Sequence, residues 1–273
     1  EEEGHMEETR RLVRVFGTQP GTGSVAGVVV GAVMPDSRER SLVAAELGVP
    51  TTVFIAVTDV ARAGVQVRFH SPVREMNACG YATIAAGLVM RAEQMWVGSS
   101  PLRVYGPTAS YELTAAVSQV GLAIPVRSER RVAASEASRL APYLGGLANP
   151  VDCRAADTGL KHLLVRVGSL PALNSLRPDR ATAVAMASVG DFDTIGYYAF
   201  GDDGVVHVRD ICAPVGDLEE PASGTTCAAL AAALTTSGEC STHRFLQGEA
   251  MGSPSLLNVS IDRNRCARVS SGG

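Results

Sequence analysis

The sequence predicts an α/β protein, of the α+β kind, that consists of two related halves. Two observations predict this class. First, short runs of branched apolar residues alternate with longer segments whose apolar residues recur at helical spacing. Second, residues 65–88 and 206–234 repeat the same ordered signals: V-x-V-R, a proline, an acidic residue, a glycine and an Ala-rich helix. Chance could produce the Ala-rich part alone, but the full order favours a duplication.

The first half contains two expected helices set among strands. Residues 37–47 show helical spacing and end before Gly48-Val49-Pro50, a combination that stops a helix. Residues 80–90 form a strongly apolar helix that begins at a glycine. The expected strands have period-two or continuous apolar patterns, and a Gly/Pro-rich turn joins the first two as a hairpin; they are residues 11–16, 25–34, 52–57, 64–69, 102–105 and 111–124.

The second half repeats this order after a charged turn at residues 127–131. We expect helices at residues 134–144, 178–188 and 224–236 and strands at 161–167, 195–200, 205–210 and 256–261. The boundary between the halves is placed at the turn, which gives residues 7–127 and 128–273. Residues 1–6 contain a Gly-His-Met step, are interpreted as an expression-tag remnant, and take no part in the fold prediction.

Composition excludes several classes of function. A net charge of −4 with 19% charged residues provides no basic surface for nucleic acid or an anionic membrane. No apolar run approaches the ~20 residues that span a bilayer, so we expect a cytoplasmic protein. The expected partner is a small substrate that carries a carboxylate, and a homodimer is left open.

The six cysteines lack any CxxC pair, and no two histidines stand at zinc-ligand spacing. We therefore expect no metal site. The default prediction is six reduced thiols, most of them small core residues.

Two glycine-marked helix starts are the candidate site. A helix N-terminus has unpaired N–H groups and partial positive charge, so it attracts carboxylates and favours a thiolate. Gly80 and Gly224 would let a ligand approach the backbone closely. Cys79 precedes the first helix and is either a proton-transferring thiol or a packed core cysteine, and spacing alone leaves both open.

The second helix start carries Glu220, Ser223 and Thr225. Glu220 could be a second acid or base, and the two hydroxyls could cap the helix or bind substrate. The alternative is that acidic residues simply favour helix starts. Three histidines on or beside strands, His70, His162 and His207, are interpreted as structural, and Cys227 as a core residue.

Five motifs resemble the PhzF-like family (phenazine biosynthesis) of the diaminopimelate epimerase and proline racemase fold. They are similar to its V-F...G-N-P-x-A, R-x-F-T-P...E...C-G-H-A-T, T-G-L, F-A-P...E-D-P-A-T-G-S and Q-G...M-G-R-P-S segments. In this chain they read Val15-Phe16...Gly23-Ser24-Val25-Ala26, Arg68-Phe69...Glu75...Cys79-Gly80-Tyr81-Ala82-Thr83, Thr158-Gly159-Leu160, Ala213-Pro214...Glu219-Glu220-Pro221-Ala222-Ser223-Gly224-Thr225 and Gln247-Gly248...Met251-Gly252-Ser253-Pro254-Ser255.

The resemblance implies two similar domains, each a curled, mostly antiparallel sheet around a central helix. It also implies an active site in the interdomain cleft and isomerisation or epimerisation without metal or cofactor. The substrate-binding residues expected from it are Ser24, Thr51, Gly80, Ala82, Ser223, Gly224 and Thr225.

The departures from the family pattern bear on the chemistry. Thr51 stands where many members carry a catalytic glutamate, Tyr81 replaces the histidine of C-G-H, and Glu220 replaces the aspartate of E-D-P. Position 221, near which a racemase would carry its second thiol, is a proline. A symmetric two-thiol racemase is therefore disfavoured, and the expected catalytic residues are Cys79, Glu220 and Tyr81.

The leading hypothesis is a cofactor-independent isomerase that shifts a double bond in a small unsaturated amino or carboxylic acid. Resemblance suggests a role in antibiotic biosynthesis, such as the formation of an alkylproline unit. The alternatives are an epimerase or dehydratase of an amino or hydroxy acid, and a non-catalytic binding protein that has lost the usual glutamate.

Overall fold

The computed structural model describes residues 8–57, 64–108, 110–116, 119–144, 152–214 and 217–271. Within these ranges the chain separates into two compact units. Unit 1 comprises the described residues of Glu1–Val15 and Ser24–Ala123, and unit 2 comprises those of Phe16–Gly23 and Ile124–Gly273. The boundary predicted at residues 127/128 is the point where one duplicated half ends and the other begins, and it stays a prediction.

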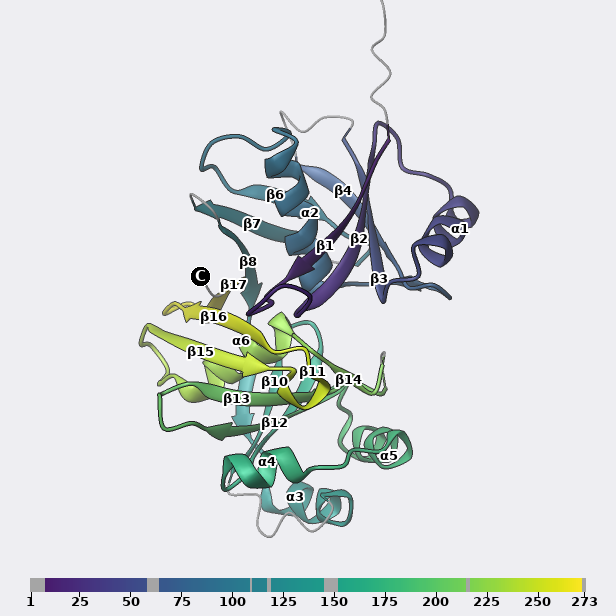
Figure 1. Ribbon diagram of the computed structural model, residues 1–273. Helices are drawn as coiled ribbons and strands as arrows, with labels where there is room; N and C mark the ends of the chain where they lie inside the picture. Colours follow the sequence, from purple (N-terminus) through teal and green to yellow (C-terminus); the bar gives the residue numbers. More distant parts are fainter. Residues whose placement is uncertain are drawn as a thin grey trace, which may run out of the picture. The chain divides into compact units, whose positions relative to one another are not determined.

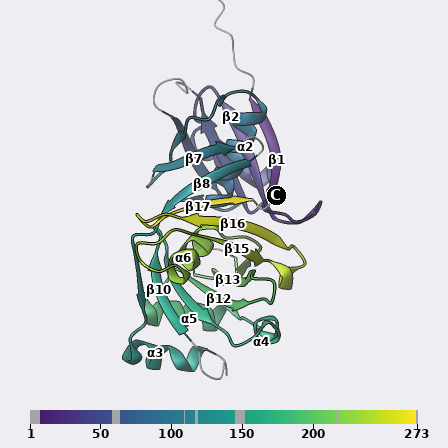
Figure 2. The ribbon, with the colours of Figure 1, turned by 90° about the vertical axis from the view of Figure 1, so that its left-hand side faces the viewer.

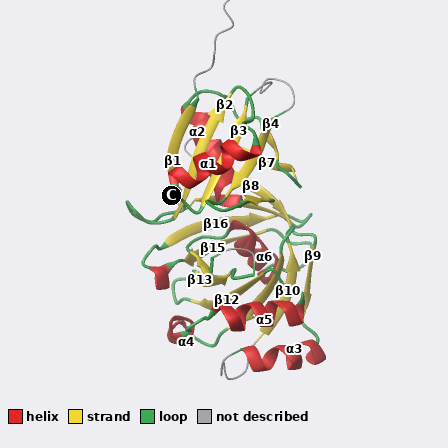
Figure 3. Ribbon diagram, turned by 90° about the vertical axis from the view of Figure 1, so that its right-hand side faces the viewer, coloured by secondary structure: helices red, strands yellow, loops and turns green. Residues whose placement is uncertain are grey.

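Unit 1 is a sheet curled around one apolar helix, α2 (Gly80–Ala92). Figure 1 shows α2 inside the curl, where it contacts the first three strands. Nine of its 13 residues are buried, as expected for a helix with few polar side chains. A second helix, α1 (Ser37–Leu47), lies on the outer face of the sheet (Figure 3). The strands are β1 (Thr9–Val15), β2 (Ser24–Gly31), β3 (Thr51–Ala56), β4 (Val65–His70), β5 (Glu75–Met76), β6 (Leu102–Tyr105), β7 (Ser110–Ala116) and β8 (Gln119–Pro125).

Unit 2 encloses α6 (Gly224–Leu234) in the same way, and Figure 2 shows strands passing around this helix. Its outer helices are α3 (Ala134–Leu140), α4 (Leu170–Ser175) and α5 (Arg180–Gly190), with short 3-10 turns at Ala141–Tyr143 and Glu249–Met251. The strands are β9 (Ser128–Arg131), β10 (Asp152–Asp157), β11 (Lys161–Arg166), β12 (Thr194–Phe200), β13 (Val206–Ile211), β14 (Glu219–Glu220), β15 (Ser241–Gln247), β16 (Ser255–Ile261) and β17 (Cys266–Ser271).

The two units share one strand topology. In unit 1, β1–β2 is antiparallel, β2–β3 parallel, β3–β4 and β4–β5 antiparallel, β4–β6 parallel, and β6–β7 and β7–β8 antiparallel. Unit 2 has the same pairings in the same order from β10 to β17. The two-half α/β prediction is confirmed at the level of this shared topology, and among the strands of the described ranges only β9 has no counterpart.

The outer helices extend the repeat beyond the segment in which the sequence reveals it. Helices α1 and α5 both follow a Pro-Asp step, and each aspartate caps its helix. Asp36 accepts a hydrogen bond from the backbone N–H of Glu39, and Asp179 accepts one from that of Thr182. An N-cap aspartate satisfies an otherwise unpaired helix donor and fixes where the helix begins.

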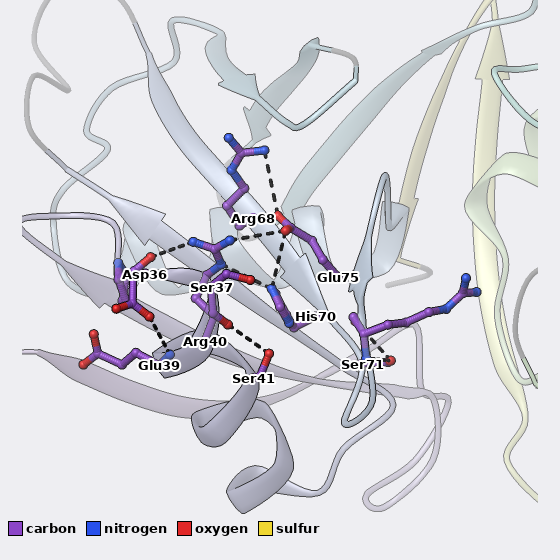
Figure 4. Close-up of polar contacts among 11 residues, drawn as sticks. Asp36, Ser37, Glu39, Arg40, Ser41, Arg68, His70, Ser71 and Glu75 are labelled. Carbon is purple, nitrogen blue, oxygen red and sulfur yellow. Dashed lines mark hydrogen bonds and ion pairs between the residues drawn. The ribbon is translucent and has the colours of Figure 1, made fainter.

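A polar cluster around the buried Arg40 and His70 attaches α1 to the sheet (Figure 4). Arg40 of α1 is 8% exposed; its Nε donates to His70 Nε2 at 3.2 Å and its Nη2 to Glu75 at 3.3 Å. Arg68 lies 3.8 Å from the same carboxylate. Desolvation, followed by the charge of Arg40, lowers the pKa of His70, so its ring is neutral. The cluster therefore holds β5, the strand that leads to Cys79.

Some expectations need correction. The helix expected at residues 134–144 ends at Leu140 and continues as a 3-10 turn that contains Pro142. Of the six free cysteines, Cys79, Cys212 and Cys227 are buried, so half of them, and not most, are core residues. Over the described part of the chain, none of the helices combines the length and apolar character of a membrane span.

Candidate active site

Cys79 is the N-cap of α2. Its extended backbone (φ −156°, ψ 109°) lets its carbonyl oxygen accept hydrogen bonds from the Thr83 backbone N–H at 3.0 Å and hydroxyl at 2.7 Å. The side chain makes no capping bond, and Sγ lies 3.7 Å from Thr51 Oγ1. The thiol is thus at the positive end of a buried helix, with 9% of the residue exposed.

Thr51 connects the predicted residues of unit 1. The Tyr81 hydroxyl donates to Thr51 Oγ1 at 2.9 Å, and Met76 Sδ lies 3.7 Å from the same oxygen. Cys79, Tyr81 and Thr51 therefore form one cluster at the start of β3 and α2. The Thr51 hydroxyl stands where the resemblance implied a carboxylate. It accepts a hydrogen bond from Tyr81 at a position where a carboxylate would carry negative charge.

Ser24 lies at the same end of the sheet. Because Ala26 is the register partner of Thr51 in the parallel β2–β3 pair, Ser24 is two residues before that level. It is 4% exposed, and its Oγ is without a hydrogen-bond partner among the described residues. Ala82 is fully buried.

In unit 2, Glu220 lies on β14 beside the start of α6. Buried Gln247 holds this segment: its Nε2 donates to the Glu220 carbonyl at 2.8 Å, and its Oε1 accepts from the Ser223 N–H at 3.2 Å. Desolvation, with smaller contributions from Asp210 and Asp217, raises the pKa of Glu220 to about 8. The carboxyl group is therefore mostly protonated near neutral pH.

Ser223 is the N-cap of α6, and its Oγ accepts from the Thr226 N–H at 3.3 Å. Thr225 Oγ1 lies 3.3 Å from Ser223 Oγ, with Gly224 between them. By the repeat, Ser223 is the counterpart of Cys79. Glu220 is the counterpart of Met76, because β4–β5 and β13–β14 have matching registers. The two candidate proton-transfer groups thus occupy different positions of the repeat.

Sequence reasoning missed a buried polar network behind Glu220. His162 is fully buried, with Nδ1 2.7 Å from Thr194 Oγ1 and 3.3 Å from Thr226 Oγ1, and Nε2 2.8 Å from Thr158 Oγ1. Desolvation lowers its pKa to about 4, so the ring is neutral. Asp210, 1% exposed, adjoins the network, since the Thr226 and Thr194 hydroxyls favour its ionised form. His162 was considered only singly, and nothing in the β13 sequence marks Asp210 beyond its being a charge on an apolar strand.

The remaining interpretations concern single residues. Cys227 is fully buried in α6, as expected for a core residue. His207, half-buried, places Nδ1 2.6 Å from the Glu249 carboxylate. The structure thus gathers Cys79, Tyr81, Thr51 and Ser24 in unit 1 and Glu220, Ser223 and Thr225 in unit 2.

A cavity of about 700 Å³ lies in unit 2, away from the residues described above. It lies between the outer helices and the sheet, and its lining includes Leu144, Met186 and Tyr197. None of the predicted site residues lines it, so it provides no support for the proposed chemistry.

A family model described as phenazine biosynthesis-like protein, PhzC-PhzF, matches residues 13–273. The chain belongs to this family. A relative from Deinococcus radiodurans, named an uncharacterized isomerase, is 28% identical over 272 residues, which are 92% of this chain and 85% of the relative.

Solved structures show the same fold. The PhzF-family protein of Bacillus anthracis superposes with a TM-score of 0.82 at 18% identity, covering 97% of this chain and 96% of its own. A hydroxyproline epimerase from Agrobacterium vitis, solved with trans-4-hydroxy-L-proline, has a TM-score of 0.57 at 14% identity, with coverage of 97% and 91%. These comparisons confirm the resemblance and the fold that it implied.

Proposed function

We propose that this member of the PhzC-PhzF family is an isomerase that moves a proton within a small unsaturated amino or carboxylic acid. The single observation that carries the proposal is the position of the candidate groups. In each unit, a proton-transfer candidate lies at or just before the start of the buried central helix, whose first N–H groups can bind a carboxylate or a developing enolate.

The protonation state of Glu220 suggests a direction. Glu220 holds its proton near neutral pH and is assigned the role of the acid, which leaves the role of the base to Cys79, at a helix N-terminus of the kind that favours a thiolate. The Cys79 sulfur takes a proton from the carbon next to the carboxylate or imine, the electron pair shifts the double bond, and Glu220 protonates the far carbon. Cys79 ends as thiol and Glu220 as carboxylate, and exchange with water resets both groups. No step requires a metal or cofactor.

The central test replaces each group in the full chain. We expect Cys79→Ser and Glu220→Gln each to lower turnover at least 100-fold on a panel of unsaturated cyclic amino acids, because each removes one proton-transfer step. Cys240→Ser, at an exposed free cysteine, is the matched control and should leave turnover unchanged. Full activity in both site variants would refute the assignment.

Epimerisation is the competing function, because the fold is shared with a hydroxyproline epimerase. It predicts that solvent deuterium enters the α carbon of recovered substrate. A non-catalytic binding protein predicts instead that ligand binding is indifferent to alkylation of Cys79. Selective iodoacetamide labelling of Cys79 at mildly acidic pH, with loss of binding, would exclude that version.

A further inference from the structure

Two carboxyl groups of unit 2 face one another across a strand pair. Asp210 on β13 and Glu220 on β14 are direct register partners in an antiparallel ladder. Directly opposed residues share a face of the sheet, with Cβ atoms about 4.5–5.5 Å apart. The two side chains are therefore neighbours, although ten residues separate them in the sequence.

The faces of the strands identify which side this is. Arg209 and Glu219, the adjacent residues, pair with each other through bonds of 2.8 and 2.7 Å, and Arg209 also donates to the Leu176 carbonyl near the outer helix α4. Side chains alternate along a strand, so Asp210 and Glu220 point to the opposite face, toward α6. The nearby arginine is thereby committed to Glu219.

Asp210 lies among hydroxyl groups. Burial has the largest effect on its carboxyl group and disfavours the ionised form, whereas the hydroxyls of Thr226, Ser223 and Thr194 favour that form. His162 links Thr194 and Thr226 from behind. One carboxyl oxygen, Oδ1, is buried without a partner among the described residues. Glu220 has no comparable set of donors among the interactions that shift its titration.

We infer that Asp210 is a positioning residue, whose negative charge in the hydroxyl network keeps the proton on Glu220 and so prepares Glu220 to act as the acid. The inference rests on the proposed function, in which Glu220 donates the proton. Two carboxylates at this separation do not both ionise readily, and the one with more hydrogen-bond donors ionises first. That residue is Asp210, whose pKa of about 6 is below the value of about 8 for Glu220.

Other titratable groups near the pair do not alter this order. Asp217, exposed in the segment before β14, adds a smaller like charge to Glu220. Burial raises the pKa of the Cys212 and Cys227 thiols, so both stay neutral, as does His162. Glu219 acts on Asp210 but is paired with Arg209.

The test is a pH titration of Glu220 in the full chain. The titration is monitored by 13C NMR of protein labelled at the glutamate carboxyl carbons, and Glu220→Gln assigns the signal. We expect Asp210→Asn, which keeps the side-chain shape, to move the Glu220 midpoint about one pH unit lower. The alkaline limb of the turnover profile should move with it, so that turnover above that limb falls about tenfold. Asp217→Asn is the control with an exposed charge and should move the midpoint less.

Thr226→Val provides a second route if Asp210→Asn fails to fold. Removal of this hydroxyl raises the pKa of Asp210 and leaves it less charged, so the Glu220 midpoint should again fall. An unchanged midpoint in a folded variant would overturn the inference. Because the midpoint is read without turnover, this result is separate from the proposed function: if Glu220→Gln retains activity, the chemistry fails while the coupling between Asp210 and Glu220 is still decided.

Discussion

Glu220 links the candidate site to the pH dependence of stability. Its pKa is raised from 4.5 to about 8, so the folded state keeps a proton that the unfolded state has lost between these values. The free energy of unfolding therefore falls as pH rises through this window. Asp210 has the same sign only up to about pH 6, and neutral His162 has the opposite sign between about 4 and 6.5. Between pH 6.5 and 8 the slope contributed by these three groups belongs to Glu220.

We expect wild-type protein to lose about 1–2 kcal/mol more than Glu220→Gln between pH 6.5 and 8, as measured by urea unfolding. Glu46→Gln, at an exposed carboxylate of α1, should follow the wild-type curve. Parallel curves for wild type and Glu220→Gln would show that the Glu220 carboxyl group titrates normally.

Tyr81 provides a second test at the level of single residues. Its hydroxyl donates to Thr51 beside the Cys79 thiol, so Tyr81→Phe removes a buried donor and costs about 1 kcal/mol of stability. As a third donor in the site, Tyr81 should also affect rate, and we expect turnover to fall at least tenfold. Tyr197→Phe is the control, because that hydroxyl makes a weak contact of 4.0 Å with Met186 Sδ of the outer helix α5, away from the candidate site residues. Equal turnover in both variants would remove Tyr81 from the site.

At the scale of elements, the helix starts have glycines that packing does not require. A Cβ at Gly80 would meet only Leu122 Cδ2 at 3.5 Å, and one at Gly224 would meet Val269 at 3.6 Å, both ordinary contacts. Gly87, in the middle of α2, differs, since a Cβ there would lie 2.8 Å from Leu113 and 2.9 Å from Val120. Packing therefore does not account for the glycines at the helix starts, whereas the close approach of substrate in the proposed function would.

We expect Gly80→Ala to leave thermal stability equal or slightly higher, because alanine favours helix by up to about 1 kcal/mol, yet to raise KM several-fold. Gly87→Ala should show the reverse, with a lower Tm and an unchanged KM of the protein that remains folded. Unaltered KM in Gly80→Ala would mean that substrate does not approach this backbone.

The cluster beneath α1 gives a prediction about how an element is attached. Glu75→Gln leaves the buried Arg40 guanidinium without its carboxylate, and we expect a loss of about 1–2 kcal/mol together with reduced turnover, because β5 leads to Cys79. Glu93→Gln breaks the more exposed pair with Arg11 and should change stability by less than about 0.5 kcal/mol. Comparable losses in denaturant unfolding would show that the Arg40–Glu75 pair stabilises the protein no more than the Arg11–Glu93 pair does.

Elements were predictable from sequence where composition was one-sided. The all-apolar runs of α2 and α6 and the Gly-Val-Pro stop after α1 marked these helices. The strands β10 and β15 were missed because Asp152–Asp157 and Ser241–Gln247 mix charged and polar residues with few apolar ones. Their strand conformation comes from pairing with neighbours far along the chain, which local patterns do not contain.

At the scale of the whole molecule, the duplication was visible in sequence only around the central helices, while the structure extends it to all seven strand pairings. Prediction of the candidate site from sequence was limited in the same way. Cys79 and Glu220 were marked by the glycines that follow them, and Thr51 by resemblance. Asp210 was not predictable, because its significance depends on the β13–β14 register that places it opposite Glu220.

The duplicated units carry unlike candidate groups, and this difference predicts the direction of proton transfer. Unit 1 contains a thiol beside two hydroxyls, and unit 2 contains a carboxyl group that holds its proton near neutral pH. Unlike acid and base groups favour transfer in one direction, whereas a racemase needs two groups that exchange roles. For an unsaturated cyclic amino acid turned over in D2O, we expect one deuterium in the product, at the carbon that Glu220 protonates, and none in substrate recovered early. Mass spectrometry with 1H NMR locates the label. Deuterium at the α carbon of recovered substrate, together with the opposite configuration at that carbon, would instead identify the chain as an epimerase, in which a second group protonates the α carbon on the face opposite Cys79.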